Sequence, residues 1–299
     1  MNKMKVLSIK EPFATLICNH KKRIETRSYN TNYRGTLYIH ASISEISKIK
    51  LNNTELMNIL GNDELSYGKI ICKCKLVDSV YMTNEFIEKI KKDKQEYICG
   101  HYEVGRYAWI LEDVEPLNIK IPATGNLGIW NYYNEDDALK IMNEIEYGYI
   151  DNNKIRHTDN NIIISKNYML QSPKDLLKSK LGICYDQVEL ERYLFQKNKW
   201  EIKTFFIKGY DKNNNCHTHT FLTYQKDNKY CWFEHAWNKY KGIHKFKNME
   251  SLLKDIKNKF IEIELKNSSN IELYEYKKPR YNISLEEYSN RCLSGVKYE

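Results

Sequence analysis

The chain has 299 residues, 41% of them hydrophobic and 13% aromatic, which is enough apolar material for the cores of two domains of about 130–150 residues each. This composition excludes general disorder, and the small numbers of Pro (5) and Gly (12) exclude collagen-like and low-complexity chains. The net charge of +8 is concentrated in residues 146–299, which contain 27 Lys and Arg against 20 Asp and Glu, whereas residues 1–145 contain 20 against 19. Such an excess favours a polyanionic or acidic partner without identifying it.

No segment approaches the roughly 18–20 consecutive apolar residues that cross a bilayer, and the first twenty residues lack the regions of a signal peptide. We therefore expect a cytoplasmic protein with no membrane partner. Its eight cysteines are dispersed and include no C-x-x-C pair, so we expect reduced thiols, no metal and no other cofactor.

The first part of the chain, residues 1–134, has the pattern of a β-rich α+β domain. Short apolar or alternating runs predict strands, and apolar residues at helical spacing predict helices between them. The predicted strands are 6–9, 35–42, 68–82 and 106–117, and the predicted helices are 13–20, 44–61 and 83–94.

Residues 135–160 are expected to form a helix and a polar linker, and a second α+β domain follows at 161–275. Ser172, Pro173 and Gly182 are typical of the start and end of a helix. An amphipathic helix is predicted directly after it, followed by an antiparallel sheet. The predicted elements are helices 172–182, 183–198 and 249–260 and strands 203–210, 217–225, 229–237 and 261–265, with residues 276–299 as a peripheral tail.

The most informative stretch of the first domain contains Lys22, Glu25 and Arg27 in the pattern K-x-x-E-x-R. Taken alone, three charges at this spacing would suit a solvated edge strand. The surrounding segments LSIKEPFA, YRGTLYIHAS, GKIICKCKLVD, GRYAWILEDVEPL and GNLGIWNY change this interpretation. Together they resemble the ASCH family over about residues 4–133, which implies a PUA-like β-barrel with flanking helices.

The ASCH resemblance implies a concave site for RNA or a modified nucleoside. Lys22 and Arg27 would donate to a phosphate or a base edge, and Glu25 would accept from an exocyclic amine. Some relatives are amidohydrolases that act on an acylated cytidine derivative, but they have Thr at the position of Glu25. The family's usual Gly before this pattern is His20 here.

In the second domain, Cys184 stands at the predicted start of helix 183–198, where unpaired backbone N–H groups favour a thiolate. His219 lies on a predicted strand, and Glu234 lies on the next strand of the same hairpin, close enough to orient an imidazole. His217, His235 and Asn238 are neighbouring candidates. A metal site built from His217, His219, Glu234 and His235 is the alternative interpretation.

The segments GICYDQVELER, HTHTF and WFEHAWNKYKGIH resemble the transglutaminase-like, papain-related superfamily over about residues 165–265. This resemblance implies a helix packed on an antiparallel sheet, with Cys184 as nucleophile, His219 as general base and acid, and Glu234 as the orienting acid. Asp is usual at the third position. A protein or peptide amide would be the substrate.

The sequence therefore predicts an RNA- or nucleoside-binding ASCH module fused to a cysteine-dependent amide hydrolase or acyltransferase. Two alternatives remain open. One is a non-enzymatic RNA-binding or regulatory protein whose second domain is catalytically degenerate. The other is an ASCH-domain amidohydrolase acting on an acylated nucleoside.

Overall fold

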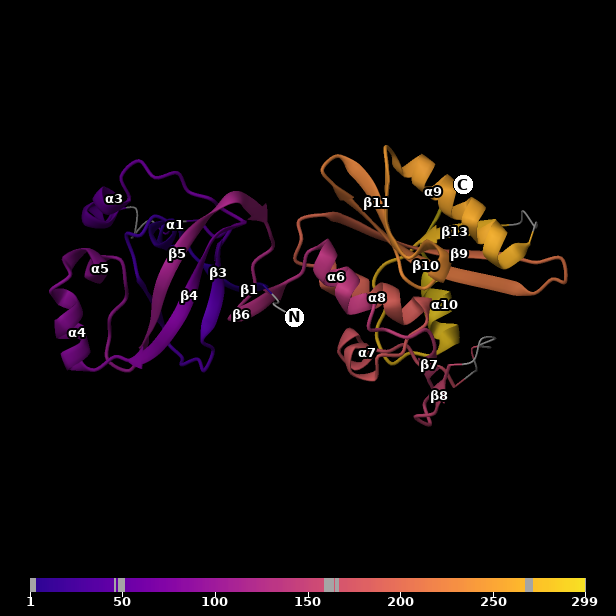
Figure 1. Cartoon of the computed structure of the whole chain (residues 1–299), viewed down its shortest axis with the longest axis horizontal. Coiled ribbons are helices and arrows are strands. Elements are labelled where there is room, and N and C mark those ends of the chain that lie inside the picture. The colour runs from indigo at the N-terminus through magenta and orange to yellow at the C-terminus, as the bar shows by residue number, and fades with distance from the viewer. Residues whose placement is uncertain are drawn as a thin grey trace. The chain divides into compact units, whose positions relative to one another are not determined.

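A computed structural model describes residues 4–45, 47, 52–158, 164, 167–266 and 271–298 (Figure 1). The chain divides into two compact units. The first contains Met1–Tyr133 and Lys197–Lys199, and the second contains Asn134–Gln196 and Trp200–Glu299. Among the described residues, no helix is long and apolar enough to cross a membrane.

The first unit is built on a six-stranded sheet that curls into a half-barrel (Figure 1). Strands β1 and β3 pair in parallel, and the other neighbours are antiparallel. In spatial order the strands are β2 (Ile24–Arg27), β5 (Tyr107–Pro122), β4 (Lys69–Tyr81), β3 (Gly35–Ala41), β1 (Met4–Ile9) and β6 (Ile129–Tyr132). The expected barrel is therefore a half-barrel with β2 and β6 at its edges.

The helices of the first unit are short. They are α1 (Phe13–Cys18), α3 (Thr54–Leu60), α4 (Asn84–Lys91) and α5 (Lys94–Ile98). Leu16 and Ile17 of α1 are fully buried, and Ile17 packs in the same core as Leu37 and Trp109 of the sheet. Of the predicted helix 44–61, only Thr54–Leu60 is helical among the described residues, as α3, and residues 46 and 48–51 lie outside the described residues.

The second unit contains another six-stranded sheet, which is antiparallel throughout. Its order is β12 (Gly242–Phe246), β11 (Lys229–Glu234), β10 (Cys216–Lys226), β9 (Glu201–Tyr210), β13 (Ile271–Glu275) and β14 (Val296–Tyr298). Successive side chains of a strand point to opposite faces. Phe206 accordingly packs with α8 (Cys184–Phe195), while Phe205 packs with α9 (Met249–Phe260). The sheet thus has a helix on each face.

Smaller elements complete the second unit. They are α6 (Glu135–Met142), β7 (Tyr149–Ile150), β8 (Arg156–His157), α7 (Pro173–Ser179), the 3₁₀ helix η1 (Asn238–Tyr240), the π-helix η2 (Ile261–Leu265) and α10 (Leu285–Leu293).

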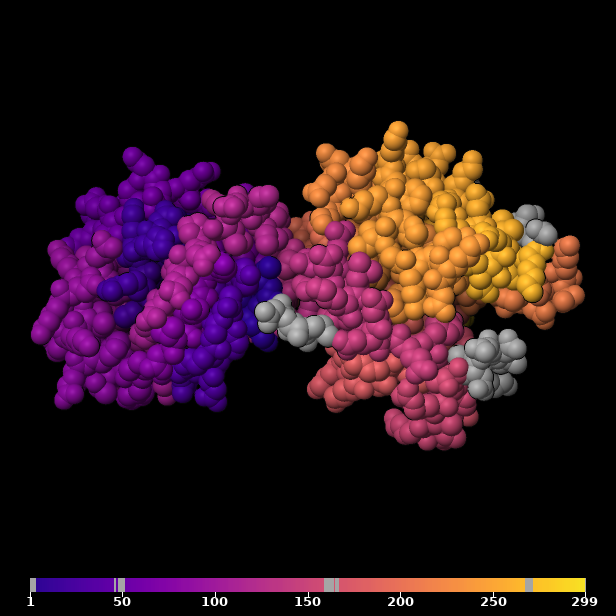
Figure 2. Space-filling model, in the orientation of Figure 1, coloured from indigo at the N-terminus to yellow at the C-terminus, as the bar shows by residue number. Residues whose placement is uncertain are grey.

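Three expectations differ from the structure. The predicted strand 261–265 is the π-helical end of α9, closed by a hydrogen bond of 2.9 Å from the Lys266 N–H to the Ile261 carbonyl. The expected tail forms α10 and β14, because Tyr288 and Cys292 are fully buried in the core beside α8; Figure 2 shows the yellow C-terminal residues packed against the orange body. The expected helix and linker, 135–160, belongs to the second unit, although residues 159–160 lie outside the described residues.

Candidate functional sites

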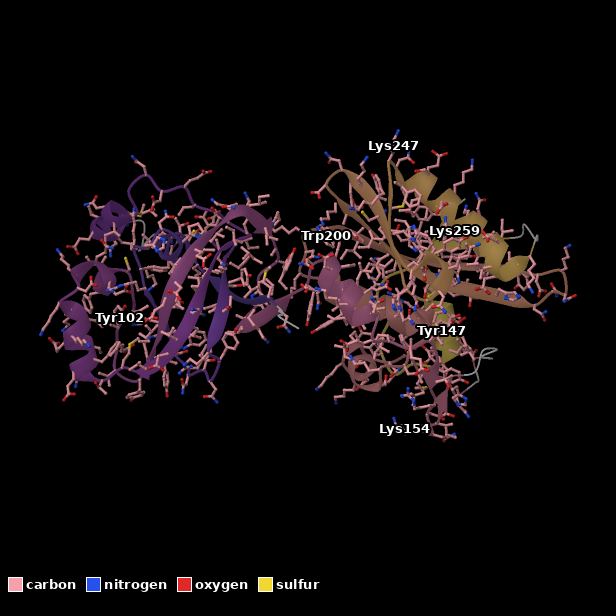
Figure 3. All side chains as sticks on the ribbon, viewed as in Figure 1. Tyr102, Tyr147, Lys154, Trp200, Lys247 and Lys259 are labelled. Carbon is pink, nitrogen blue, oxygen red and sulfur yellow. The ribbon has the colours of Figure 1, made fainter. Side chains whose placement is uncertain are left out.

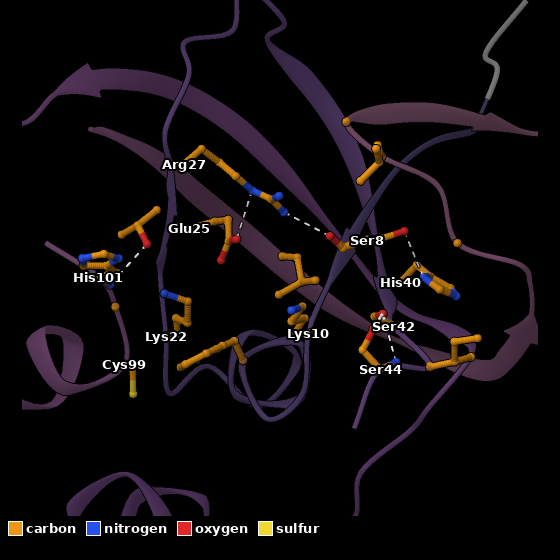
Figure 4. A pocket seen from close by; sticks show the side chains of 18 of the residues that line it. Ser8, Lys10, Lys22, Glu25, Arg27, His40, Ser42, Ser44, Cys99 and His101 are labelled. Atoms are coloured by element: carbon orange, nitrogen blue, oxygen red, sulfur yellow. Dashed lines mark hydrogen bonds and ion pairs between the residues drawn. The ribbon is translucent and has the colours of Figure 1, made fainter. Parts of the chain in front are cut away.

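A cleft of about 880 Å³ opens in the first unit (Figure 4). Its walls come from the ends of β1 and β3, from β2, and from the segments 98–106 and 124–128. Pockets that hold small ligands have volumes of about 300–1,000 Å³, so the cleft is large enough for a nucleoside-sized molecule.

The structure brings Lys22, Glu25 and Arg27 together in this cleft (Figure 4). Arg27 Nε lies 3.1 Å from Glu25 Oε1, and the same guanidinium donates a hydrogen bond of 3.0 Å to the Ser8 carbonyl. Lys22 is 1% exposed, donates to the Ile24 carbonyl and lies 5.6 Å from the centroid of the Phe13 ring. The cleft floor therefore carries two cations and one carboxylate that only a ligand entering the cleft can reach.

Glu96 positions the start of β2, the strand that carries Glu25 and Arg27 and directly follows Lys22. Its buried carboxylate accepts hydrogen bonds from the backbone N–H groups of Arg23 and Ile24, at 2.7 and 3.2 Å, and from the Tyr102 hydroxyl at 2.9 Å. A carboxylate that satisfies two backbone donors at the start of β2 fixes the direction in which the strand enters the cleft.

A second hydrogen-bond network in the cleft joins Ser8 and His40, which the sequence analysis did not single out. His40 Nε2 lies 3.1 Å from the Ala123 carbonyl, which can only accept, so this nitrogen carries the proton. The Ser8 hydroxyl then donates to His40 Nδ1 at 3.1 Å. Ser8 Oγ also accepts from the Asn126 N–H and the Trp130 indole, at 3.2 and 3.1 Å. Burial lowers the His40 pKa, which keeps the ring neutral.

In the second unit, Cys184 is the first residue of α8 and is 4% exposed. It lies near enough to His219 for the two side chains to interact electrostatically. His219 Nε2 lies 2.9 Å from Glu234 Oε2. The three residues named from the sequence therefore lie together in one buried cluster.

Two neighbours hold this cluster in place. The Trp237 ring stacks on the His219 ring with centroids 3.9 Å apart and planes 15° apart. The Trp237 backbone N–H donates to Glu234 Oε1 at 2.8 Å, so both oxygens of the carboxylate are engaged. Burial alone lowers the pKa of His219, but Glu234 and Cys184 together raise it to about 10. The ring is therefore held as an imidazolium.

Glu191 was not foreseen and lies beside this cluster. It is 2% exposed and interacts electrostatically with His219, Glu234 and Cys184. Burial, and then the charge of Glu234, raise its pKa well above the usual range of a carboxyl group, so it is held neutral. Its position seven residues after Cys184, two turns along one helix face, is the sequence signal that could have revealed it.

Tyr147, labelled in Figure 3, interacts electrostatically with Cys184 and Glu234 of the cluster. Burial of its hydroxyl, and then the neighbouring Cys184, raise its pKa well above the usual range.

The other candidates named from the sequence have different partners. His217 lies 3.2 Å from Asp211 and 3.4 Å from Glu264, and His235 Nδ1 lies 3.3 Å from Gln187. Asn238 begins the 3₁₀ helix η1. Within the described ranges, no group of three or more His, Cys, Asp or Glu side chains is arranged to hold a metal. The metal alternative therefore gains no support.

The curled mixed sheet of the first unit, with a cleft lined in part by charged side chains, is consistent with a PUA-like fold. Residues 7–122 match the family model of the ASCH domain, and this part of the chain is an ASCH domain. A comparison with curated proteins finds no match to the chain. The transglutaminase-like resemblance of the second unit stays a prediction.

Proposed function

We propose that the chain joins an RNA- or nucleoside-binding ASCH domain to a cysteine-dependent amide hydrolase or acyltransferase. The observation that carries the enzymatic part is the buried pair of His219 and Glu234, with Nε2 and Oε2 2.9 Å apart, near the Cys184 thiol with which His219 interacts electrostatically. A thiol at the start of a helix, an imidazole and an orienting carboxylate are the parts that activate a cysteine nucleophile.

The proposed reaction uses these groups in two steps. The Cys184 sulfur attacks the carbonyl carbon of an amide, the C–N bond breaks, and the His219 imidazolium gives its proton to the departing amine. Water or a second amine then attacks the thioester and gives a proton to His219, and the Cys184 thiolate leaves. Glu234 stays ionised and keeps the ring oriented.

The cleft of the ASCH domain supports binding of RNA or a nucleoside. Its lining contains four cationic side chains, Lys10, Lys22, Arg27 and Arg106, against the single carboxylate of Glu25. An excess of cations with hydrogen-bonding capacity suits phosphate and base edges. Because Glu25 is paired with Arg27, the site supports binding better than the amidohydrolase alternative.

Covalent capture tests the enzymatic part. The full chain is incubated with an acyl electrophile that traps thioester-forming cysteines, and the adduct is located by peptide mass mapping. We expect one adduct on Cys184 that Cys184→Ala abolishes and Cys292→Ala, a change at another buried cysteine of the same unit, leaves intact. Failure to label Cys184 would favour the non-enzymatic alternative.

A further inference from the structure

Leu127 is the most exposed large hydrophobic side chain in the described part of the chain, at 94% exposure. It stands in the segment 124–128 that lines the ASCH cleft. Ile43, also among the lining residues, is 66% exposed. Two apolar side chains of the cleft lining are therefore exposed to solvent, whereas Lys22 and Glu25 of the same lining are buried.

The backbone around Leu127 is held by specific contacts. The Asn126 N–H donates to Ser8 Oγ at 3.2 Å, and the Leu127 N–H donates to Asn126 Oδ1 at 3.0 Å. Gly125 packs so closely on this network that a Cβ there would lie 2.9 Å from a ring carbon of His40. Gly128 has a φ of +65°, a conformation that favours glycine. The contacts of Gly125 and Asn126 thus anchor the loop directly before the exposed Leu127.

We propose that Leu127 is a wedge that enters the base stack of a paired RNA while one extruded base enters the cleft. This inference rests on the proposal that the cleft binds RNA. A base inside a duplex cannot reach the buried Lys22 and Glu25, so a base read by these groups must leave its stack. Extrusion leaves a gap between neighbouring bases, and apolar side chains such as Leu fill gaps of this kind.

The charges beside the mouth agree with this binding mode. Lys10 is exposed, and Arg106 lines the cleft from the segment 98–106. Cations at the rim suit the phosphates that flank an extruded nucleotide, while the apolar Leu127 suits the base faces between them.

The test compares a paired RNA hairpin and a single strand of the same sequence, each with one 2-aminopurine. Leu127→Ser is paired with Ile119→Ser, a control on β5 that is 82% exposed and outside the cleft lining. We expect Leu127→Ser to weaken binding of the hairpin at least roughly tenfold more than binding of the single strand, because unstacking must then occur without the wedge. The rise in 2-aminopurine fluorescence on hairpin binding should also be lost, and Ile119→Ser should change neither.

Equal weakening of both RNAs by Leu127→Ser, or equal behaviour of the two variants, would overturn the wedge while leaving RNA binding by the domain intact. Failure of the unaltered chain to bind the single strand would instead refute the proposed RNA binding, and the wedge with it.

Discussion

His219 Nε2 lies 2.9 Å from Glu234 Oε2, and each of these side chains is 2% exposed. Pairing between β10 and β11 runs from Lys226 opposite Lys229 to Leu222 opposite Phe233. Continued by one position, this register places Glu234 opposite Phe221, two residues from His219. Such diagonal neighbours are about 7–8 Å apart at their Cα atoms, a span that a long side chain can bridge. The extra methylene of Glu, compared with Asp, suits this position.

Glu234→Gln should remove most of the pH dependence that His219 contributes to stability. The folded pKa of His219, about 10, lies above the ordinary 6.5 because Glu234 and Cys184 outweigh burial. The stabilisation is therefore fully present below about pH 6.5 and is lost as the pH rises through about 10. We expect urea unfolding to show a steep loss of stability over this range in the unaltered chain and a shallower loss in Glu234→Gln. Glu201→Gln, an exposed control on β9, should follow the unaltered chain; parallel curves for all three proteins would contradict this account.

Two buried glutamates on α8 should respond differently to the same substitution. Glu189 lies 3.1 Å from Arg192, so Glu189→Gln removes the charged partner of this largely buried guanidinium, leaving its hydrogen bond to Thr204, and should cost about 1–3 kcal/mol. Glu191 is held neutral, so Glu191→Gln should not destabilise the chain at pH 7 and should stabilise it, because Gln does not have to take up a proton on folding.

The pH dependence gives a further test of Glu191. A carboxyl group with a raised folded pKa loses stability as the pH rises above its unfolded value of about 4.5, so Glu191→Gln should become progressively more stable than the unaltered chain above that pH. A large loss of stability in Glu191→Gln at pH 7 would show that Glu191 is ionised and paired.

Lys22→Met and Arg27→Ala should each weaken RNA binding by roughly tenfold or more, since contacts of this kind are worth about 1–3 kcal/mol. Met keeps the apolar stem of the buried Lys22, which limits the cost to folding. Arg23→Ala is the matched control, because Arg23 is adjacent in sequence, is 65% exposed and pairs with Asp93. Fluorescence anisotropy with a labelled single-stranded RNA measures the affinity of all three variants. Equal effects of Arg23→Ala and Arg27→Ala would mean that binding reflects overall charge and not the cleft.

His20→Gly should stabilise the chain. His20 has a φ of 59°, a left-handed conformation that costs a side-chain-bearing residue about 1–2 kcal/mol, while Gly loses about 0.5–1 kcal/mol more backbone entropy. The expected net gain is about 0.5–1 kcal/mol in urea unfolding. His101→Gly, at an exposed position without a positive φ, should bring no gain. A loss of stability in His20→Gly would show that the His20 side chain makes a stabilising contact.

Part of this architecture could be predicted from the sequence because it depends on local pattern. The nearness of His219 to Glu234 follows from counting residues back from the Lys226–Lys229 turn. The start of a helix at Cys184 agrees with the expected helix 183–198, although the preceding helix α7 ends at Ser179, with Lys180 and not Gly182 in the left-handed capping conformation. The catalytic roles of these three residues remain a proposal.

Other features could not be predicted because they depend on contacts between distant segments. Glu96 accepts a hydrogen bond from the start of β2, 73 positions away in the chain. The sequence around Glu96 predicts only an ordinary polar helix. Apolar and acidic residues alternate in 261–265, a pattern typical of a strand. In the structure, the segment instead continues α9 as a π-helix and buries Leu265. The sequence predicted that Tyr288 lies in a peripheral polar tail, whereas in the structure it packs in the core with Tyr185 of α8.

The central claim, that His219 activates Cys184, is tested most directly by the rate at which iodoacetamide alkylates Cys184 between pH 6 and 8, followed by peptide mass mapping. The account predicts rapid alkylation already at pH 6, slowed roughly tenfold to a hundredfold by His219→Ala and less by Glu234→Gln. Cys216, an exposed cysteine on the same strand as His219, is the internal control, and its rate should not respond to either change. A Cys184 that reacts slowly at every pH, at a rate that neither substitution alters, would contradict the proposed activation.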